Sequence, residues 1–156
     1  MIYHAYIESH LTYVLPVWGT APNLYLNIIK VLQNKCMKII LKKSPLTSSS
    51  QLYNEKQLSL SQKIIFESIF YIFKIKNSLL KTDTILITYH DTSNIETRNS
   101  SKLKPPRFKG ALAQRSIYYK GIELYNALPY ELSTTQKISN FKNKLKTYVR
   151  SQFPTL

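Results

Sequence analysis

The stretch SLSQKIIFESIFYIFKIKNSLL, Ser59 to Leu80, contains the most apolar window of the chain and decides the expected fold. Its apolar residues recur at spacings of three and four, so it predicts a long helix. The window Ile64 to Ile75 is too short to cross a bilayer and contains Glu67, which argues against a membrane span. The stripe expected to face a core consists of Ile65, Ile69, Ile72, Phe73 and Leu79.

Two more helices are predicted before this segment. The first starts near Tyr3 and ends before, or kinks at, Pro16, because proline breaks helical hydrogen bonding. The second begins near Pro22 and ends before the proline and serines of KKSPLTSSSQ. Its broad apolar face is expected in the core and comprises Leu24, Ile28, Val31, Leu32, Cys36, Ile39 and Ile40. Its outer, mostly basic stripe comprises Lys30, Asn34, Lys38 and Lys42.

The second half of the chain is less regular. Residues 81–106 show no sustained period and predict a long loop, with TILITY as a candidate strand. In SIYYKGIELYNALP, β-branched and aromatic residues favour a strand, whereas spacings of three and four favour a short helix, which we expect. Asn126 is expected to hydrogen-bond within its own turn. Ser139 is a candidate cap of a last helix, whose inner residues are Phe141, Leu145, Tyr148 and Val149.

These elements predict a mainly α-helical single domain over residues 1–156. A bundle-like helical part is expected at 1–80 and an irregular loop at 81–106. A basic closing segment with possible short strands and a terminal amphipathic helix is expected at 107–156.

Charge is the strongest compositional signal. The 156 residues include 22 Lys and Arg against 8 Asp and Glu, a formal net charge of +14. Local ion pairs cannot neutralise such an excess, so the surface attracts polyanions, with nucleic acid ahead of an anionic membrane. Cys36 is the only cysteine, which fits an intracellular, nuclear or cytoplasmic protein. No secretory signal is recognised at the N-terminus.

The sequence offers little for catalysis. Its only aspartates, Asp83 and Asp91, fall in the predicted loop, whereas two-metal chemistry needs clustered carboxylates. Cys36 lies on an apolar helix face without a histidine nearby in sequence. His4 and His10 are placed on different faces of one helix, and the three glycines form no phosphate loop. We therefore expect no enzyme activity, metal, cofactor or small-molecule substrate.

Basic residues interleaved with aromatic ones form the better candidate site. Cations neutralise phosphates and aromatic rings stack on unpaired bases, so the pattern suits low-specificity binding of RNA or DNA. An ordinary lysine-rich surface with half-buried tyrosines would explain it as well, and the terminal helix could instead rest on anionic lipid. The candidate residues are Lys102, Lys104, Arg107, Lys109, Arg115, Tyr118, Tyr119, Lys120, Lys142 and Lys146.

Three segments, in order, resemble the C-terminal region of reverse transcriptases from jockey-like non-LTR retrotransposons. The first is IYHAYIESHLTYVLPVWGTA continuing into LNIIKVLQNKCMKIILKKSP, similar to the region that follows the polymerase thumb. The second is TRNSSKLKPPRFKGALAQRSIYYKGIELYNALP, and the third is FKNKLKTYV. The resemblance covers nearly the whole chain and implies an appendage, binding RNA or DNA, of an RNA-directed DNA polymerase.

The chain departs from this family where catalysis occurs. It has no adjacent aspartates, no endonuclease and no zinc-knuckle cysteines and histidines, so no catalytic residue is carried over. We expect the surviving end of a transposable element, read as a separate gene, or a truncated gene model, with Met1 an internal methionine or a chance start. The leading hypothesis is a non-catalytic nucleic-acid-binding segment. The alternatives are a purely structural buttress of the polymerase thumb, left as an orphan fragment, and a host-adapted helical protein that binds a partner. The sequence does not define an oligomeric state.

Overall fold

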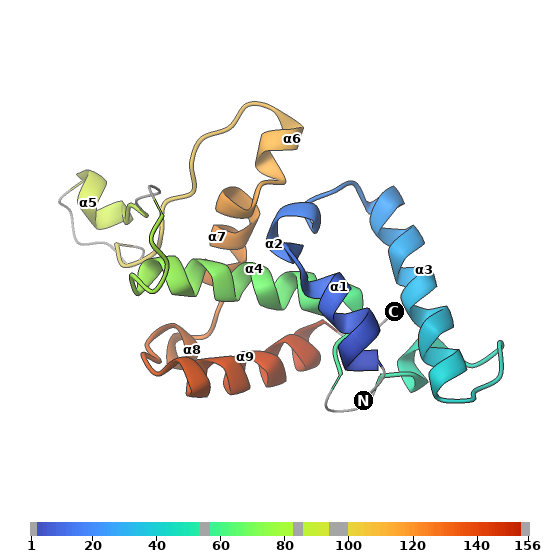
Figure 1. The fold of residues 1–156 in the computed structure, drawn as a ribbon. Coiled ribbons are helices and arrows are strands. Elements are labelled where there is room, and N and C mark those ends of the chain that lie inside the picture. The colour runs from blue at the N-terminus through green and yellow to red at the C-terminus, as the bar shows by residue number, and fades with distance from the viewer. Residues whose placement is uncertain (1–2, 54–56, 83–85, 94–99, 154–156) are drawn as a thin grey trace. The chain divides into compact units, whose positions relative to one another are not determined.

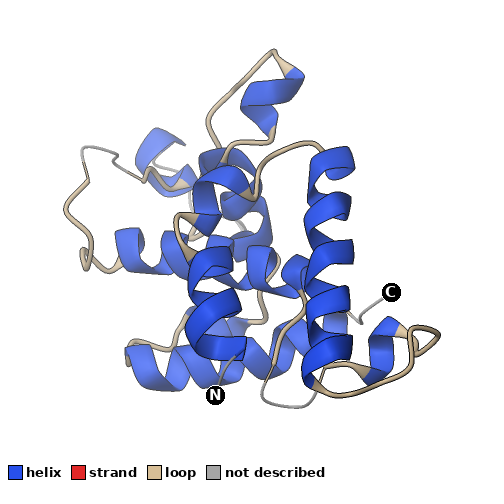
Figure 2. Ribbon diagram, turned by 45° about the vertical axis from the view of Figure 1, so that its right-hand side comes forward, coloured by secondary structure: helices blue, strands red, loops and turns tan. Residues whose placement is uncertain are grey.

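The computed structural model describes residues 3–53, 57–82, 86–93 and 100–153, and these residues are mainly α-helical (Figures 1 and 2). Within them no sheet forms, and strand-like pairing is confined to one antiparallel bridge between Thr88 and Leu103. The mainly α prediction is therefore confirmed. The elements in chain order are η1 (Tyr3–Glu8), α1 (Ser9–Thr12), α2 (Leu15–Trp18), α3 (Asn23–Ile40), η2 (Ser49–Gln51), α4 (Leu60–Lys76), α5 (Tyr89–Ser93), α6 (Ala111–Gln114), η3 (Ile117–Gly121), α7 (Ile122–Asn126), α8 (Tyr130–Ser133) and α9 (Ile138–Gln152).

Two compact units make up the chain. Unit 1 consists of residues 1–67 and 145–156, and unit 2 consists of residues 68–144. Helices α4 and α9 therefore each contribute one segment to each unit. The units are described separately below.

The expected first helix of unit 1 is divided into three short pieces. The π-helical turn η1 leads into α1, and the chain then breaks at Tyr13 and Val14 before α2. Val14 adopts a left-handed backbone with φ of 50°, an unfavourable conformation for a β-branched residue. The indole Nε1 of Trp18 donates a hydrogen bond of 2.8 Å to the carbonyl of Tyr13 and fastens this turn. The predicted break before Pro16 is confirmed.

Helix α3 begins after Pro22, as expected, but its orientation is the reverse of the prediction. The residues that it buries are Gln33 and Met37. Met37 packs with Tyr3 and Leu52 in the core of unit 1. The face predicted to be core is largely exposed, and Lys30, Asn34 and Lys38 of the predicted outer stripe are half-buried.

Polar anchoring explains the reversal. The side chain of Gln33 donates to the Tyr3 hydroxyl at 2.6 Å and accepts from the Leu60 backbone N–H at 2.9 Å. The Tyr53 hydroxyl donates to Asn34 Oδ1 at 2.5 Å. Buried polar groups that lose a partner cost about 1–3 kcal/mol each. These bonds therefore hold the amide-bearing face of α3 against the core.

Aromatic stacking dominates the core of unit 2. The rings of Phe73 and Phe141 stack with centroids 3.8 Å apart, and Phe70 lies 6.2 Å from Phe73 and 6.4 Å from Phe141. Gly121 lies against Ile72, where an added Cβ would come within 3.1 Å of its side chain. The apolar residues buried around this unit include Ile117, Ile122, Tyr125, Leu128 and Leu132.

The inner stripe predicted for α4 is correct except at its end. Ile69, Ile72 and Phe73 are buried, and Ile65 is half-buried. Leu79 is exposed, because the helix ends at Lys76 and the chain reverses beyond it.

Both α3 and α4 end in the same capping motif, with a residue other than glycine in the left-handed position. After α4, Ser78 has φ of 54° and Leu79 N–H donates to the Lys74 carbonyl at 2.9 Å. After α3, Lys42 has φ of 50° and Lys43 N–H donates to the Lys38 carbonyl at 2.9 Å. This is the Schellman pattern, for which glycine is the usual residue.

The closing part of the chain is helical, as expected. The ambiguous segment forms η3 and α7, so the helical reading of SIYYKGIELYNALP is confirmed. Helix α9 begins at Ile138, one residue before the expected cap. Its inner residues Phe141, Leu145 and Val149 are buried and Tyr148 is half-buried. The candidate strand TILITY lies partly outside the described residues, and in its described part Thr88 forms the bridge to Leu103.

Candidate nucleic-acid interface

Nine of the ten candidate residues lie in unit 2, and Lys146 lies in unit 1. Lys104, Tyr118, Tyr119 and Lys146 are half-buried. The exposed members are Lys102, Arg107, Lys109, Arg115, Lys120 and Lys142. The structure thus places five of the exposed cations in one continuous segment, residues 102–120, and Lys142 on α9.

Asn126 of α7 anchors the start of this basic segment. Its Oδ1 accepts a hydrogen bond of 3.0 Å from the Leu103 N–H, and its Nδ2 donates one of 2.7 Å to the Leu103 carbonyl. Leu103 is buried between Lys102 and Lys104. The expectation of a bond within the turn of Asn126 is wrong, because the amide satisfies both backbone groups of a residue 23 positions earlier.

A second chain segment supports the same stretch from its other side. Tyr89 N–H donates to the Lys102 carbonyl at 3.1 Å, and Lys104 N–H donates to the Ile87 carbonyl at 2.8 Å. With the bridge from Thr88, these bonds form a short antiparallel pairing. The backbone on either side of Leu103 is therefore held in an extended form, which directs successive side chains to opposite sides. Lys102 and Lys104 accordingly flank a buried leucine and share one side.

Beyond Lys104, an exposed loop carries an aromatic ring between two cations. Arg107, Phe108 and Lys109 are all exposed. The Gln114 side chain donates to the Phe108 carbonyl at 3.0 Å and joins this loop to α6. Arg115 follows directly after α6. Phe108, one of the aromatic residues that the sequence pattern interleaves with cations, thus exposes its ring close in sequence to Arg107, Lys109 and Arg115.

The two candidate tyrosines lie on the π-helical turn η3. The hydroxyls of Tyr118 and Tyr71 share a hydrogen bond of 3.2 Å, and their rings meet edge to face at 6.2 Å. Burial, with a further contribution from the bond to Tyr118, raises the pKa of Tyr71 to about 12. Tyr118 is therefore engaged within unit 2. Tyr119 is half-buried.

The basic segment is poorly neutralised. In the described residues, its one ion pair joins Lys120 Nζ to Glu123 at 3.0 Å. Among the described residues, no carboxylate pairs with the other cations of residues 102–120. Uncompensated cations on an ordered backbone produce a positive potential at the surface.

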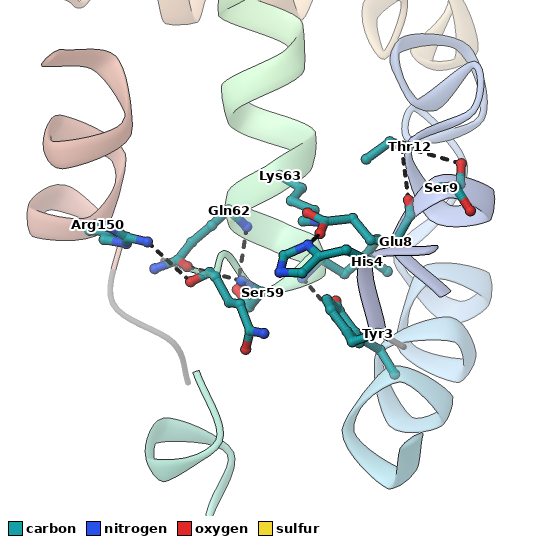
Figure 3. Close-up of polar contacts among 12 residues, drawn as sticks. Tyr3, His4, Glu8, Ser9, Thr12, Ser59, Gln62, Lys63 and Arg150 are labelled. Atoms are coloured by element: carbon teal, nitrogen blue, oxygen red, sulfur yellow. Dashed lines mark hydrogen bonds and ion pairs between the residues drawn. The ribbon is translucent and has the colours of Figure 1, made fainter. Parts of the chain in front are cut away.

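Unit 1 contains a separate buried polar network that the sequence analysis did not identify (Figure 3). Lys63 is buried and pairs with Glu8, which also pairs with His4. The Lys63 ammonium lies 5.8 Å from the centroid of the Tyr3 ring. The sequence indication of this ion pair was the position of Lys63 within the apolar helix α4, because a buried lysine needs a partner.

The charges of this pair oppose the effect of burial. Burial lowers the pKa of the Lys63 ammonium, and the hydrogen bond and charge of Glu8 offset part of that effect. Burial alone would raise the pKa of Glu8. The hydrogen bonds and charges of Lys63 and His4 outweigh it and hold the pKa of Glu8 below its ordinary value. The arrangement joins η1 to α4 and has the character of a structural ion pair.

The start of α4 and the residues before it are tied to the end of α9 and to Phe153 beyond it; Figure 3 shows Gln62 and Arg150. Gln62 Nε2 donates to the Phe153 carbonyl at 2.8 Å, and Arg150 donates to the Gln57 carbonyl at 3.4 Å. Gln62 Oε1 also accepts from the Ser59 N–H at 3.1 Å, which caps the start of α4. These contacts hold the start of α4 and the end of α9 together within unit 1.

Three further features of the described residues concern other kinds of site. Across the described residues, no three histidine, cysteine, aspartate or glutamate side chains gather to hold a metal. An open depression of about 740 Å³ in unit 2 is lined by Asn77, Leu79, Gln136, Lys137, Ile138 and Ser139. None of the helices in the described part of the chain is long and apolar enough to pass through a bilayer.

Comparison of the chain with models of known protein families, with curated proteins and with solved structures finds no match. The family relationship suggested by the sequence segments is therefore a proposal, to be judged on residues and experiments.

Proposed function

We propose that the chain is a non-catalytic nucleic-acid-binding segment derived from the C-terminal region of a retrotransposon RNA-directed DNA polymerase. The observation that carries this proposal is the basic segment, residues 102–120. It exposes five cations on a backbone anchored by Asn126, with only Lys120 paired to a carboxylate among the described residues. The ligand class is RNA or DNA, bound mainly through its phosphates.

Binding through this segment is non-covalent and requires no catalytic step. Arg107, Lys109 and Arg115 supply charge-assisted hydrogen bonds to phosphate oxygens. The ring of Phe108, exposed among them, stacks on an unpaired base, which favours single strands over duplexes. Such contacts are tolerant of sequence because every base presents a flat face.

The motif Asn-Ala-Leu-Pro, which is part of the resemblance to this polymerase region, has a structural role in unit 2. Asn126 secures Leu103 through two hydrogen bonds, and Leu128 is buried. Pro129 precedes the first residue of α8. Each of these positions thus has a role in building unit 2, which supports treating the motif as a structural signature of the resembled region.

The proposal predicts a strong dependence on salt. For single strands, log K falls with log salt by about 0.7 per phosphate neutralised, so five contacts give a slope of about −3.5. Raising salt from 50 to 200 mM should then weaken binding by about 100-fold. The measurement is a fluorescence anisotropy titration of a labelled single-stranded RNA across that range. An absence of binding at low salt would refute the proposal.

A charge-reversal variant locates the interface. Combining Arg107→Glu, Lys109→Glu and Arg115→Glu should weaken binding at 50 mM salt by at least about 30-fold, because three phosphate contacts become repulsive. All three side chains are exposed, so the fold should be retained.

A matched control separates local contacts from net charge. Combining Lys42→Glu, Lys43→Glu and Lys81→Glu changes the net charge equally, at exposed positions outside the basic segment. This control should lose only a few-fold in affinity. Equal losses in the two triple variants would show that binding is not localised to the basic segment.

A second candidate function is structural, with the chain buttressing a larger assembly. The apolar face that α3 leaves exposed favours it, because the largest apolar patch of a protein surface is often an interaction site. Under this alternative, the salt series would detect no RNA binding even at the lowest salt.

A further inference from the structure

Six large apolar side chains of α3 lie along one side of the helix in solvent. Their spacing places them within a stripe about one third of the helix circumference. Each is between 52% and 76% exposed. Helix α3 lies at an outer edge of unit 1 in both ribbon views (Figures 1 and 2). The stripe consists of Leu24, Tyr25, Ile28, Val31, Leu32 and Ile39.

The exposed area is comparable to the largest apolar patch of a typical monomeric protein. Full burial of a leucine or isoleucine removes on the order of 100 Å² of apolar surface, so the stripe exposes roughly 350–400 Å². Patches of this size commonly mark interaction sites. Two facing stripes would bury about twice that area before any polar rim is counted. This total, about 700–800 Å² of apolar surface, is smaller than a standard specific interface and belongs with weak, transient contacts.

The charges of α3 decide the orientation of a symmetric pair. The helix contains no acidic residue, and its lysines, Lys30, Lys35 and Lys38, all lie beyond its first turns. Lys35 lies within the stripe itself. In a parallel pair the two Lys35 ammonium groups would face each other, which is unfavourable in a poorly solvated seam. Parallel helix dipoles would add to this cost.

An antiparallel pair avoids these conflicts. With a two-fold axis between Val31 and Leu32, Leu24 of one copy faces Ile39 of the other. Ile28 then faces the aliphatic stem of Lys35, whose ammonium reaches solvent at the helix edge. The uncharged first half of each helix meets the basic second half of its partner. The stripe is therefore complementary to itself in this orientation.

We propose that a second copy of this chain covers the exposed stripe of α3, giving a weak antiparallel homodimer. The interface is isologous, because the same surface of each copy is used. It is independent of the basic segment and of any nucleic acid.

Sedimentation velocity of the full chain over a concentration series, without nucleic acid, tests the proposal. We expect a monomer near 1 µM and mostly dimer near 100 µM, in keeping with the buried area. Combining Ile28→Glu and Leu32→Glu should leave a monomer at every concentration. The matched control combines Leu112→Glu and Tyr130→Glu, at exposed apolar positions of unit 2, and should still dimerise.

Two results would overturn the proposal. One is a wild-type monomer at 100 µM, a test that needs no variant and so cannot be confused with misfolding. The other is a dimer that persists in the Ile28→Glu, Leu32→Glu variant with unchanged far-ultraviolet circular dichroism. A monomer that is covered only by some other protein would give the first of these results.

Cysteine cross-linking tests the orientation. In a Cys36→Ser background, Val31→Cys should oxidise readily to a covalent dimer because it lies beside the axis. Leu24→Cys alone should not, whereas Leu24→Cys combined with Ile39→Cys should. Efficient cross-linking by Leu24→Cys alone would indicate a parallel pair and contradict the proposed interface. Because RNA is absent throughout, these outcomes do not depend on the proposed nucleic-acid binding.

Discussion

Replacing Asn126 by leucine removes both hydrogen bonds that hold the backbone of Leu103. The leucine side chain is similar in size and cannot accept from the Leu103 N–H or donate to its carbonyl. Leu103 is 2% exposed, so water does not readily replace the lost partners. Two hydrogen bonds contribute about 0.5–1.5 kcal/mol each, and leaving the buried groups unsatisfied raises the loss further. We expect local opening at Leu103 to become easier by about 2–4 kcal/mol.

Amide hydrogen exchange at Leu103 measures this change directly. A difference of 2–4 kcal/mol corresponds to exchange faster by roughly 30- to 700-fold, at about 1.4 kcal/mol per factor of ten. Asn126→Asp keeps an acceptor for the Leu103 N–H and loses the donor to its carbonyl, so its effect should be intermediate at neutral pH. The affinity for single-stranded RNA should fall with the same ranking, because Lys102 and Lys104 lose their ordered backbone.

The control is Asn140→Leu, an exposed asparagine in the first turn of α9. It changes the same chemical groups without touching Leu103. Unchanged exchange at Leu103 in Asn126→Leu would refute the anchoring role. Equal acceleration in the two leucine variants would attribute the effect to general destabilisation.

Three further predictions concern stability. Ser78→Gly should raise the melting temperature, because glycine adopts a left-handed backbone without strain, whereas Ser78→Ala should not. We expect the free energies of unfolding of the two variants, measured with urea, to differ by about 0.5–1 kcal/mol. Glu8→Gln should cost about 1–3 kcal/mol, because the buried Lys63 ammonium keeps a neutral acceptor and loses its counter-charge. Because the folded pKa of Glu8 is depressed, its contribution is present above the ordinary carboxyl pKa and is lost as pH falls through the folded value. The free energy of unfolding of Glu8→Gln should therefore fall less between neutral and acidic pH than that of the wild type. Tyr125→Phe should leave the free energy of unfolding unchanged or increase it, because the buried Tyr125 hydroxyl has no hydrogen-bond partner in the described residues; a loss above about 1 kcal/mol would contradict this reading.

Helical periodicity predicted α4 and α9 well because their apolar stripes and their buried faces coincide. The buried residues Ile69, Ile72 and Phe73 of α4, and Phe141 and Leu145 of α9, fall where the spacing of three and four places them. Periodicity measures only which residues share a face. It succeeds when that face is also the one that packs.

The same reasoning failed for α3 because partners distant in sequence determine its orientation. Gln33 is buried through bonds to Tyr3 and Leu60, and neither bond follows from the residues around Gln33. The pairing of Asn126 with Leu103 was missed for the same reason, since an asparagine before a proline suggests a local turn. The exposed cations of the basic segment were found from composition, whereas their anchoring required the structure.

The salt dependence of single-stranded RNA binding tests the proposed function most directly. It compares the wild type with a variant combining Arg107→Gln, Lys109→Gln and Arg115→Gln, which removes charge without adding repulsion. The account predicts that the slope of log K against log salt becomes shallower by about 2 in the variant, since three phosphate contacts are lost at about 0.7 each. Identical slopes for the two proteins would contradict binding through the basic segment.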